Sequence, residues 1–511
     1  MPLRAWLDLS TPLAGAPGVQ ALNVSLDEWR TLAVDFAAAG ARLFALWASG
    51  DDSGAPAVRA VFLTESQAFL VNLRLARPDV RYPGLENLFP AASRMQRAIA
   101  DLCGLYSTDP DTRPWLRHAA WPSDFRPLID AQVPAAVPGA IDNYEFVRVE
   151  GEGVHEIPVG PVHAGTIEPG HFRFSVVGEK VLKLEERLGY THKGIERRFT
   201  ELPILEGHRL AARVSGDSAV AFSWAYCQAL EGMANVHIPP RAAWLRALSL
   251  ELERVANHLG DLGALGNDAG FAFGLAQFSR LKEQVLRAAN EALGARYLMD
   301  IVVPGGTSRN LRDAGVRALA ACIRDVGEEA RHLRTIYDEH EGVRDRFNGA
   351  GAVAPGLATR LGLIGLAGRA SGQAFDLRAD LPCAPYSELA VAKVVRSEGD
   401  VAARVAVRFD ELQESCRLIL RILGSMPSGP HVMSVPAPER GTIGVGLIEG
   451  WRGPVLVGLE AGEAGSIRRC HPHDPSWQNW PVLEHAIIGN IVPDFPLINK
   501  SFNLAYSGHD L

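Results

Sequence analysis

Residues 241–263 read RAAWLRALSLELERVANHLGDLG, and this stretch decides what kind of fold the chain adopts. Its apolar residues recur at intervals of three and four and make one stripe, formed by Leu245, Leu248, Leu252, Val255, Ala256 and Leu259. Because a helix repeats about every 3.6 residues, this spacing predicts a long helix that buries one face. The pattern returns at 280–293, 316–337 and 405–423. We therefore expect a helical bundle at the centre of the protein.

The segments on either side of the bundle carry a different pattern. Gly, Pro and β-branched residues alternate in 431–460, and short glycine-rich runs occupy 146–181, which indicates strands and turns. Nearer the N-terminus, strand-like runs at 60–63 and 68–73 accompany a helical pattern at 26–39. This combination predicts a small α+β unit before the helical part.

The length of 511 residues exceeds what one hydrophobic core usually organises, so we expect more than one domain. Proline and small residues accumulate at 127–138, a composition that does not continue a helix and commonly marks a linker. We predict an α+β protein with a small domain at 1–126, a linker at 127–145 and a large domain at 146–511. The large domain is expected to be mainly helical with short peripheral β-sheets.

Composition excludes several classes of function. The formal net charge of -8 argues against a nucleic-acid partner, which requires a basic surface to displace counterions from phosphates. No run reaches the roughly 18 apolar residues of a membrane-spanning helix. The first 18 residues also lack the apolar core of a secretory signal. These observations predict a cytoplasmic protein.

The six cysteines give no sign of a disulfide framework, a zinc site or an iron-sulfur site, because none of them forms a Cys-x-x-Cys pair. We expect buried, reduced thiols. The nearest approach to a dinucleotide fingerprint, GVGLIEG at 444–450, has the wrong last interval and continues into strand-like sequence. The chain is therefore not expected to bind a nucleotide.

Titratable side chains gather in GPVHAGTIEPGHFRF, residues 160–174, which contains His163, Glu168 and His171. Three such groups within nine residues suggest a metal site. Metal ligands usually also show helical or hairpin spacing, however, and histidines often serve only as hydrogen-bonding groups. Both interpretations stay open, and the sequence favours the second.

Residues 160–174 and the segment KLEERLGYTHKGIERRF (183–199) closely resemble the start of the large subunit of group 4 nickel-iron hydrogenases, which are membrane-bound and energy-converting. They also resemble the related subunit in the catalytic core of respiratory complex I, the NADH-quinone oxidoreductase. The resemblance continues through 238–263, 303–311, 371–382 and 399–415. Within this family the chain resembles the formate hydrogenlyase subunit 5-like proteins. The resemblance implies a fold like that of the nickel-hydrogenase large subunit.

The N-terminal unit shares in the resemblance. The run VRYPGLENLFPAASRMQRAIADLCGLYSTDPDTRPWLR (80–117) is similar to the small companion subunit of complex I, fused upstream of the large domain. In that family the companion serves assembly and docking. The resemblance is weakest before residue 75.

The nickel ligands of the hydrogenases are missing at the matching positions. In those enzymes four thiolates hold nickel, two from Arg-x-Cys-Gly-x-Cys and two from Asp-Pro-Cys-x-x-Cys near the C-terminus. Here the matching residues are Ser215, Ser218, Ala505 and Gly508. A serine hydroxyl is a poor ligand for a thiophilic metal, and Ala and Gly offer no side-chain donor. The resemblance therefore argues against a nickel-iron centre and against hydrogen activation.

The resemblance also assigns roles around the emptied cavity. Glu168 matches the carboxylate that shuttles protons in hydrogenases, and Arg452 and Arg213 match arginines of their site. A structural alternative is that a buried Arg and Glu simply pair to stabilise packing. In complex I the cavity receives a quinone headgroup, and His163 matches the histidine that contacts it, whereas the position of the contacting tyrosine holds Arg213.

Further residues of the cavity wall are predicted from the same segments. They are His171 from the turn-rich stretch, and Ser215 and Ser218 at the former ligand positions. Together with His163 these residues make up the expected quinone site.

We expect a subunit of a membrane-associated, complex I-like oxidoreductase that passes electrons from a partner's iron-sulfur cluster to a quinone. The chain itself is predicted to bind no cofactor. Its expected partners are the iron-sulfur subunit of the peripheral arm and the membrane antiporter-like and quinone-module subunits, which would attach it to the inner face of the cell membrane. A non-catalytic scaffold that transmits conformational change is the main alternative. A true hydrogenase with unusual ligands is a third.

Overall fold

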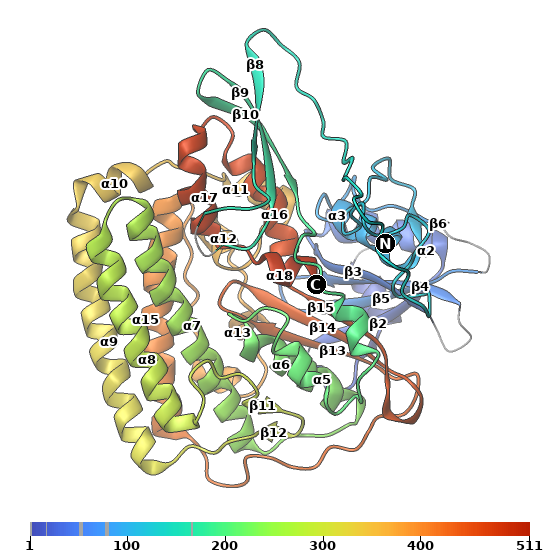
Figure 1. Cartoon of the computed structure of the whole chain (residues 1–511). Coiled ribbons are helices and arrows are strands. Elements are labelled where there is room, and N and C mark those ends of the chain that lie inside the picture. Colours follow the sequence, from blue (N-terminus) through green and yellow to red (C-terminus); the bar gives the residue numbers. More distant parts are fainter. Residues whose placement is uncertain (1–2, 17, 51–54, 77–80, 165–166) are drawn as a thin grey trace.

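The computed structural model describes residues 3–16, 18–50, 55–76, 81–164 and 167–511. Figure 1 shows long helices side by side on one flank, a larger sheet on the other, and a small sheet between the two. A narrow three-stranded sheet projects from the top of this arrangement. The predicted fold class, an α+β protein with a mainly helical large part, is confirmed.

The N-terminal unit is a five-stranded sheet with the strand order β1-β2-β5-β4-β3. Strands β2 and β5 are parallel, and the other neighbours are antiparallel. Its strands and helices are α1 (Leu3–Leu9), β1 (Thr11–Pro12), β2 (Val19–Val24), α2 (Leu26–Ala38), β3 (Arg42–Gly50), β4 (Pro56–Leu63), β5 (Ala68–Arg74), β6 (Arg81–Tyr82), α3 (Ala92–Cys103) and β7 (Tyr106–Ser107).

The helix and strand patterns that the sequence shows in this unit correspond to elements of the structure. Helix α2 starts with a capping box, in which the side chains of Ser25 and Glu28 each accept a bond from the other's backbone N–H. The runs at 60–63 and 68–73 lie inside β4 and β5, whose side chains are almost entirely buried. Both faces of the central strands are therefore covered, which explains why they are continuously apolar.

The central bundle consists of α7 (Pro240–Asp268), α8 (Ala272–Leu293), α9 (Asp313–Glu339) and α15 (Val401–Ser425). The stretch that predicted it lies within α7, which contacts both α8 and α15. Helix α7 is buried on more than its apolar stripe. Glu251 and Arg254, with no exposed surface, form an ion pair of 3.2 Å inside the bundle, so charged groups are part of the core.

Helix α6 (Ala219–Met233) lies on the sheet made by β13 (Ile443–Glu449), β14 (Pro454–Ala461) and β15 (Ile467–His473), as Figure 1 shows. A Cβ on Gly446 would lie 1.8 Å from the carbonyl oxygen of Ala225 on α6. The glycines of 444–450 therefore allow a helix to lie directly on a strand.

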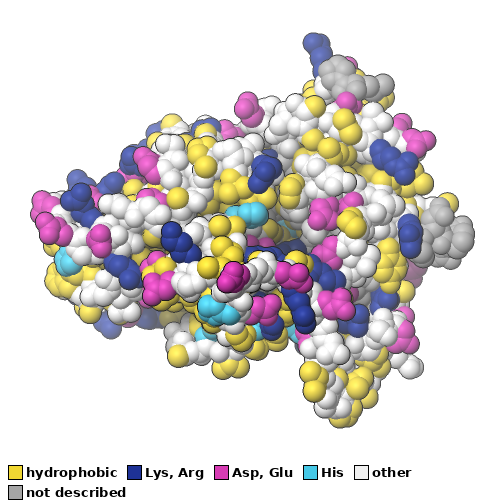
Figure 2. Space-filling view, turned by 90° about the horizontal axis from the view of Figure 1, so that it is seen from above, with side chains coloured by type: hydrophobic (Ala, Val, Ile, Leu, Met, Phe, Trp, Pro, Cys, Tyr) yellow, Lys and Arg dark blue, Asp and Glu magenta, His cyan; other side chains and the backbone are white. Residues whose placement is uncertain are grey.

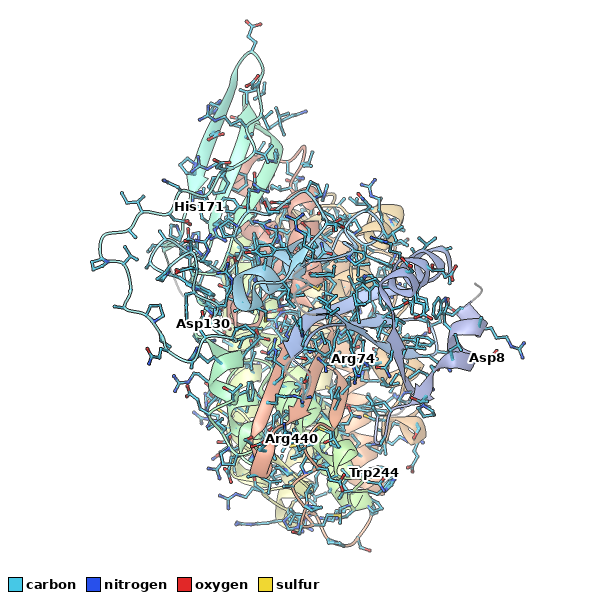
Figure 3. The ribbon with its side chains drawn as sticks, turned by 90° about the vertical axis from the view of Figure 1, so that its right-hand side faces the viewer. Asp8, Arg74, Asp130, His171, Trp244 and Arg440 are labelled. Carbon is cyan, nitrogen blue, oxygen red and sulfur yellow. The ribbon has the colours of Figure 1, made fainter. Side chains whose placement is uncertain are left out.

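A third sheet, β10-β9-β8, projects from the body of the molecule. Its strands are β8 (Val154–Val159), β9 (His171–Val177) and β10 (Lys180–Arg187), joined in antiparallel pairs. Figure 3 shows His171 at the base of this sheet and Asp130 on the irregular segment that leads up to it. The predicted linker, residues 127–145, contains neither helix nor strand and lies mostly on the surface.

The C-terminal part returns to the centre of the molecule (Figure 1). It contains α16 (Ser476–Ala486), α17 (Phe495–Phe502) and α18 (Tyr506–Asp510). The remaining elements are α4 (Ile195–Phe199), α5 (Gly207–Ala211), β11 (Val302–Val303), β12 (Gly306–Thr307), α10 (Glu341–Phe347), α11 (Pro355–Leu361), α12 (Gly365–Ala370), α13 (Leu377–Asp380), α14 (Tyr386–Leu389), and the 3₁₀ turns η1 (Glu463–Gly465) and η2 (Val492–Asp494).

The hydrophobic core continues from the N-terminal unit into the large part of the chain. Trp47 of β3 stacks on His471 of β15 with ring centroids 5.0 Å apart, and Arg59 of β4 pairs with Glu460 of β14 at 2.9 Å. The division at 127–145 stays a prediction. In the part of the chain that the structure describes, no helix is both long and apolar enough to cross a membrane.

Candidate functional site

Five segments that are distant in the sequence enclose a cavity of about 470 Å³. They are the connection between β8 and β9, the turn before α6, the end of α7, the turn between β13 and β14, and α17 with α18. Among the described residues its lining consists of Ala164, Ile167, Glu168, Ser215, Gly216, Asp217, Asp268, Arg452, Pro496, Asn499, Lys500, Asn503, Leu504, Ala505, Tyr506 and Ser507. The cavity thus collects residues from both ends of the large part. Figure 2 shows the molecule from above, with dark-blue and magenta side chains close together near the middle of this face.

The two serines at the start of α6 are organised by the aspartate between them. Ser215 donates its hydroxyl to Oδ1 of Asp217 at 2.6 Å, and Ser218 donates to the same oxygen at 3.3 Å. Burial alone would raise the pKa of Asp217, but the charge of Arg452 and hydrogen bonds from Arg452 and both serines hold it below its usual value. At this end of the cavity an ionised carboxylate, rather than a pair of thiolates, is the dominant group.

Arg452 is fixed in the cavity wall from several sides. Its Nη2 lies 2.6 Å from Oδ2 of Asp217, and its Nε donates to the carbonyl oxygen of Asn503 at 2.5 Å. The guanidinium also lies over the ring of Trp451, 4.3 Å from its centroid. Only 4% of the side chain is exposed, so this positive charge faces little water.

The cavity lining carries a second cation, which shares Asn503 with Arg452 as a hydrogen-bond partner. Lys500 of α17 has its Nζ 3.5 Å from Oδ1 of Asp261 and 3.3 Å from Oδ1 of Asn503. Asp261 is itself buried on α7, and its other oxygen accepts from Arg408 at 2.9 Å. Lys500 is about one third exposed and belongs to the cavity lining.

Two protonatable groups lie near the C-terminal helix. The backbone N–H of Ser507 donates to Oε2 of Glu168 at 3.1 Å, which ties the connection before β9 to α18. Burial raises the pKa of Tyr506, so its phenol stays protonated at neutral pH and can donate a hydrogen bond. Burial also raises the pKa of Asp268 at the end of α7.

Four predicted site residues lie outside this lining: Ser218, whose hydroxyl bonds to Asp217 at its edge, and His163, His171 and Arg213. His163 points its Nε2 to the carbonyl oxygen of Gly170 at 2.8 Å, and His171 points its Nδ1 to that of Gly160 at 3.2 Å, so both brace the connection between β8 and β9. Arg213 forms a two-pronged ion pair with Asp300, with both nitrogens at 2.7 Å from the carboxylate, and is 45% exposed. The structure brings together Glu168, Arg452 and Ser215 in the lining, but not these four.

The donors at the former ligand positions do not fit a four-thiolate metal. Both serine hydroxyls point to Asp217, Ala505 offers no donor, and Gly508 has no side chain. None of the described lining residues is a cysteine. In the described ranges no group of three or more His, Cys, Asp or Glu side chains is arranged to hold a metal ion.

Sequence reasoning missed Asp217, Asp268, Lys500 and Tyr506 as lining residues. Asp217 stands between the two serines that were singled out, so its place next to the cavity could have been inferred from them. Lys500 and Tyr506 lie in the C-terminal segment that matches the second nickel-ligand motif, but neither stands at a ligand position, so the motif does not mark them.

A search of solved structures shows a similar fold in "Structure of the membrane-bound sulfane sulfur reductase (MBS), an archaeal respiratory membrane complex". The TM-score is 0.66 at 24% sequence identity, and the match covers 70% of this chain and 99% of that chain. The large-subunit-like fold expected from the sequence is thereby confirmed.

Sequence comparisons define the class of protein. The profile of the family described as "Respiratory-chain NADH dehydrogenase, 49 Kd subunit" matches residues 268–444. The chain is also 31% identical over 438 residues to formate hydrogenlyase subunit 5 of Escherichia coli (strain K12), a match that covers 84% of this chain and 77% of that protein. The chain therefore belongs to the family that joins hydrogenase large subunits with the 49 kDa subunit of the respiratory NADH dehydrogenase.

Two more relatives place the chain within that family. It is 29% identical over 451 residues to hydrogenase-4 component G of Escherichia coli (strain K12), covering 87% of this chain and 78% of that protein. It is 27% identical over 407 residues to the C/D fusion protein of the NADH-quinone oxidoreductase of Bacteroides thetaiotaomicron, covering 75% and 76%. The predicted relationship to hydrogenases and complex I is confirmed.

Proposed function

We propose that this chain is a nickel-free subunit of a membrane-associated oxidoreductase complex, in which the central cavity receives a quinone. Electrons come from an iron-sulfur cluster of a partner subunit in the peripheral arm. Membrane antiporter-like and quinone-module subunits attach the chain to the inner face of the membrane. The observation that carries the proposal is a cavity of about 470 Å³ lined by cations, carboxylates and hydroxyls, with no sulfur ligand among its described residues.

The lining suits the chemistry of quinone reduction. Two electrons and two protons convert a quinone into a quinol, and each carbonyl oxygen becomes a hydroxyl. Lys500 and Tyr506 offer hydrogen-bond donors to those oxygens, and Glu168 offers a carboxyl group at the cavity surface for proton delivery. His163 supports this reaction indirectly, since it holds the connection that carries Glu168.

A scaffold without catalysis is the second candidate, and one observation favours it. Arg452 and Lys500 are the two cations among the described lining residues, and each already lies beside a carboxylate of the protein, Asp217 and Asp261. Such pairs satisfy the charges without any ligand. The two candidates differ in what they predict for a change at Glu168.

The test is quinone-dependent reoxidation of the reduced iron-sulfur chain in the intact complex, purified through this subunit. We expect rapid, inhibitor-sensitive reoxidation, and a loss of about a hundredfold or more in Glu168→Gln with assembly intact. Glu328→Gln, at an exposed position of α9, is the matched control and retains full turnover. Unchanged turnover in Glu168→Gln would favour the scaffold, and no reoxidation in a complete complex would exclude the quinone.

A further inference from the structure

The space beside Gly508 is already occupied by another side chain. An ideal Cβ built on Gly508 would lie 2.7 Å from Oδ2 and 2.9 Å from Cγ of Asp474. Real Cβ atoms essentially never approach another heavy atom within 3.0 Å. Gly508 has no positive φ, so it is needed here for space rather than for backbone conformation. A side chain at 508 and the carboxylate of Asp474 therefore exclude each other.

Asp474 is buried in this place and anchored through one of its carboxylate oxygens. It follows β15 and has no exposed surface, and its Oδ1 accepts from the backbone N–H of Ser476 at 2.8 Å at the start of α16. Ser476 in turn accepts the backbone N–H of Ala505 at 2.9 Å. The short segment 474–476 is thus attached to the same turn of chain that carries two of the former ligand positions.

The second oxygen of Asp474 faces Arg452. Oδ2 lies 3.8 Å from Nη1 of Arg452, and neither atom has a hydrogen-bond partner among the described residues. Nη2 of the same guanidinium is bound by Asp217 on the cavity side. Arg452 therefore stands between two carboxylates, one at the cavity and one behind the wall, and its distance of 3.8 Å from Asp474 makes this second ion pair the looser of the two.

We propose that Asp474 has taken over the space of the fourth ligand: it excludes a thiolate at position 508 and, with Asp217, positions the guanidinium of Arg452 at the cavity. The exclusion of a thiolate at position 508 concerns metal specificity and does not depend on the proposed function. The positioning of Arg452 rests on the proposed function, since it assigns Arg452 to binding of the acceptor. Restoring four cysteines would consequently not restore a tetrathiolate metal site while Asp474 is present.

A double-mutant cycle on the full-length chain tests the exclusion. We expect Gly508→Ala to raise the unfolding equilibrium constant by about 10- to 100-fold, and the same change to have little effect when Asp474 is already Ala. Gly356→Ala is the matched control, since nothing lies within 4 Å of its Cβ, and its effect should be the same in both backgrounds. Additive effects of Gly508→Ala and Asp474→Ala would overturn the proposal.

Metal binding gives an independent readout. A variant with cysteine at positions 215, 218, 505 and 508 is compared anaerobically with the same variant carrying Asp474→Ala, using Co²⁺ alone as the probe. We expect thiolate-to-cobalt charge-transfer absorption equivalent to one tetrathiolate ion per chain only when Asp474 is removed. Equal absorption in both variants, including none in either, would contradict the assignment of Asp474 as the excluding residue.

The positioning role is tested by kinetics in the intact complex. Asp474→Ala frees one side of Arg452, so we expect KM for the quinone to rise by about tenfold or more while kcat changes less. An unchanged KM would refute the role of Asp474 in positioning Arg452. If the complex without substitutions does not reduce quinone, the proposed function fails, whereas the stability cycle and the cobalt experiment still decide the exclusion.

Discussion

Nη2 of Arg452 lies 2.6 Å from Oδ2 of Asp217, and this ion pair joins the turn between β13 and β14 to the turn that starts α6. The two residues are 235 positions apart in the sequence. Arg452 is almost fully buried, whereas 34% of the Asp217 side chain is exposed. Water therefore reaches the Asp217 side of the ion pair but hardly reaches the Arg452 side. Loss of the partner should consequently cost more free energy at Arg452 than at Asp217.

Replacing Asp217 by Asn should destabilise the chain, because it leaves the buried Arg452 with Asp474 as its nearest charged partner at 3.8 Å. We expect a loss of about 2 kcal/mol in the free energy of unfolding, measured by urea denaturation. In the double variant Asp217→Asn/Arg452→Gln the losses should be less than additive. Strict additivity would mean that the two side chains do not interact energetically.

Glu253 should make stability depend on pH. Burial raises its pKa from 4.5 to about 8, and backbone N–H bonds from Val220 and Ala221 offset this only in part. Between these values the folded state holds a proton that the unfolded state has lost, so this contribution to stability is complete below pH 4.5 and is lost as pH rises towards 8. The slope is about 1.4 kcal/mol per pH unit.

The measurement is the unfolding midpoint of the full chain from pH 5 to 8 beside that of Glu253→Gln. We expect the variant to lack this part of the decline, so that the difference between the two curves changes with pH. Glu291→Gln, at an exposed position of α8, is the control and should run parallel to the unsubstituted chain. A pH-independent difference for Glu253→Gln would refute the elevated pKa.

Arg369 should be indispensable for the core. It is fully buried, with Nε 2.7 Å from Glu411 and Nη1 2.7 Å from Glu449. Arg369→Met leaves two buried carboxylates without their cation, so we expect a loss of about 3–5 kcal/mol in denaturant titrations. Arg280→Met removes an exposed ion pair with Glu329 and should cost no more than about 1 kcal/mol. A similar cost for both would contradict this account.

Trp47 should hold the N-terminal unit to the large part. Its indole stacks on His471, and a Cβ on Gly458 would lie 2.7 Å from its Cζ2. Trp47→Ala should cost about 3–5 kcal/mol and speed cleavage within 127–145 under limited proteolysis. Leu9→Ala, at a side chain that is 62% exposed, is the control. Unchanged proteolysis in Trp47→Ala would show that this contact does not limit opening.

The bundle was predictable from the sequence because α7 carries an apolar stripe at helical spacing. The same stripe implied a polar face in water, yet Glu251 and Arg254 on that face have no exposed surface. Charged residues that pair with other helices cannot be told from solvated ones by periodicity, because their partners lie far away in the chain. Glu251 accepts from Ser415 of α15 at 2.6 Å, for example.

The candidate site was predictable only in part, for a related reason. Glu168, Ser215 and Arg452 were matched by motif and meet in one cavity, although they come from different segments. Arg213 is two residues from Ser215 but points to Asp300 at the surface, and sequence proximity does not determine side-chain direction. Asp474 carries no motif at all, and its relation to Gly508 arises only when β15 and α18 are packed together.

The stacking of Trp47 on His471 has a consequence for how the chain is made. During synthesis the N-terminal sheet is complete soon after residue 74, whereas β14 and β15, which cover it, begin at Pro454 and Ile467. While the residues between these elements are being made, the growing chain therefore presents an uncovered aromatic surface. Occupation of that surface by a chaperone, until β15 has left the ribosome, would prevent nascent chains from associating with one another.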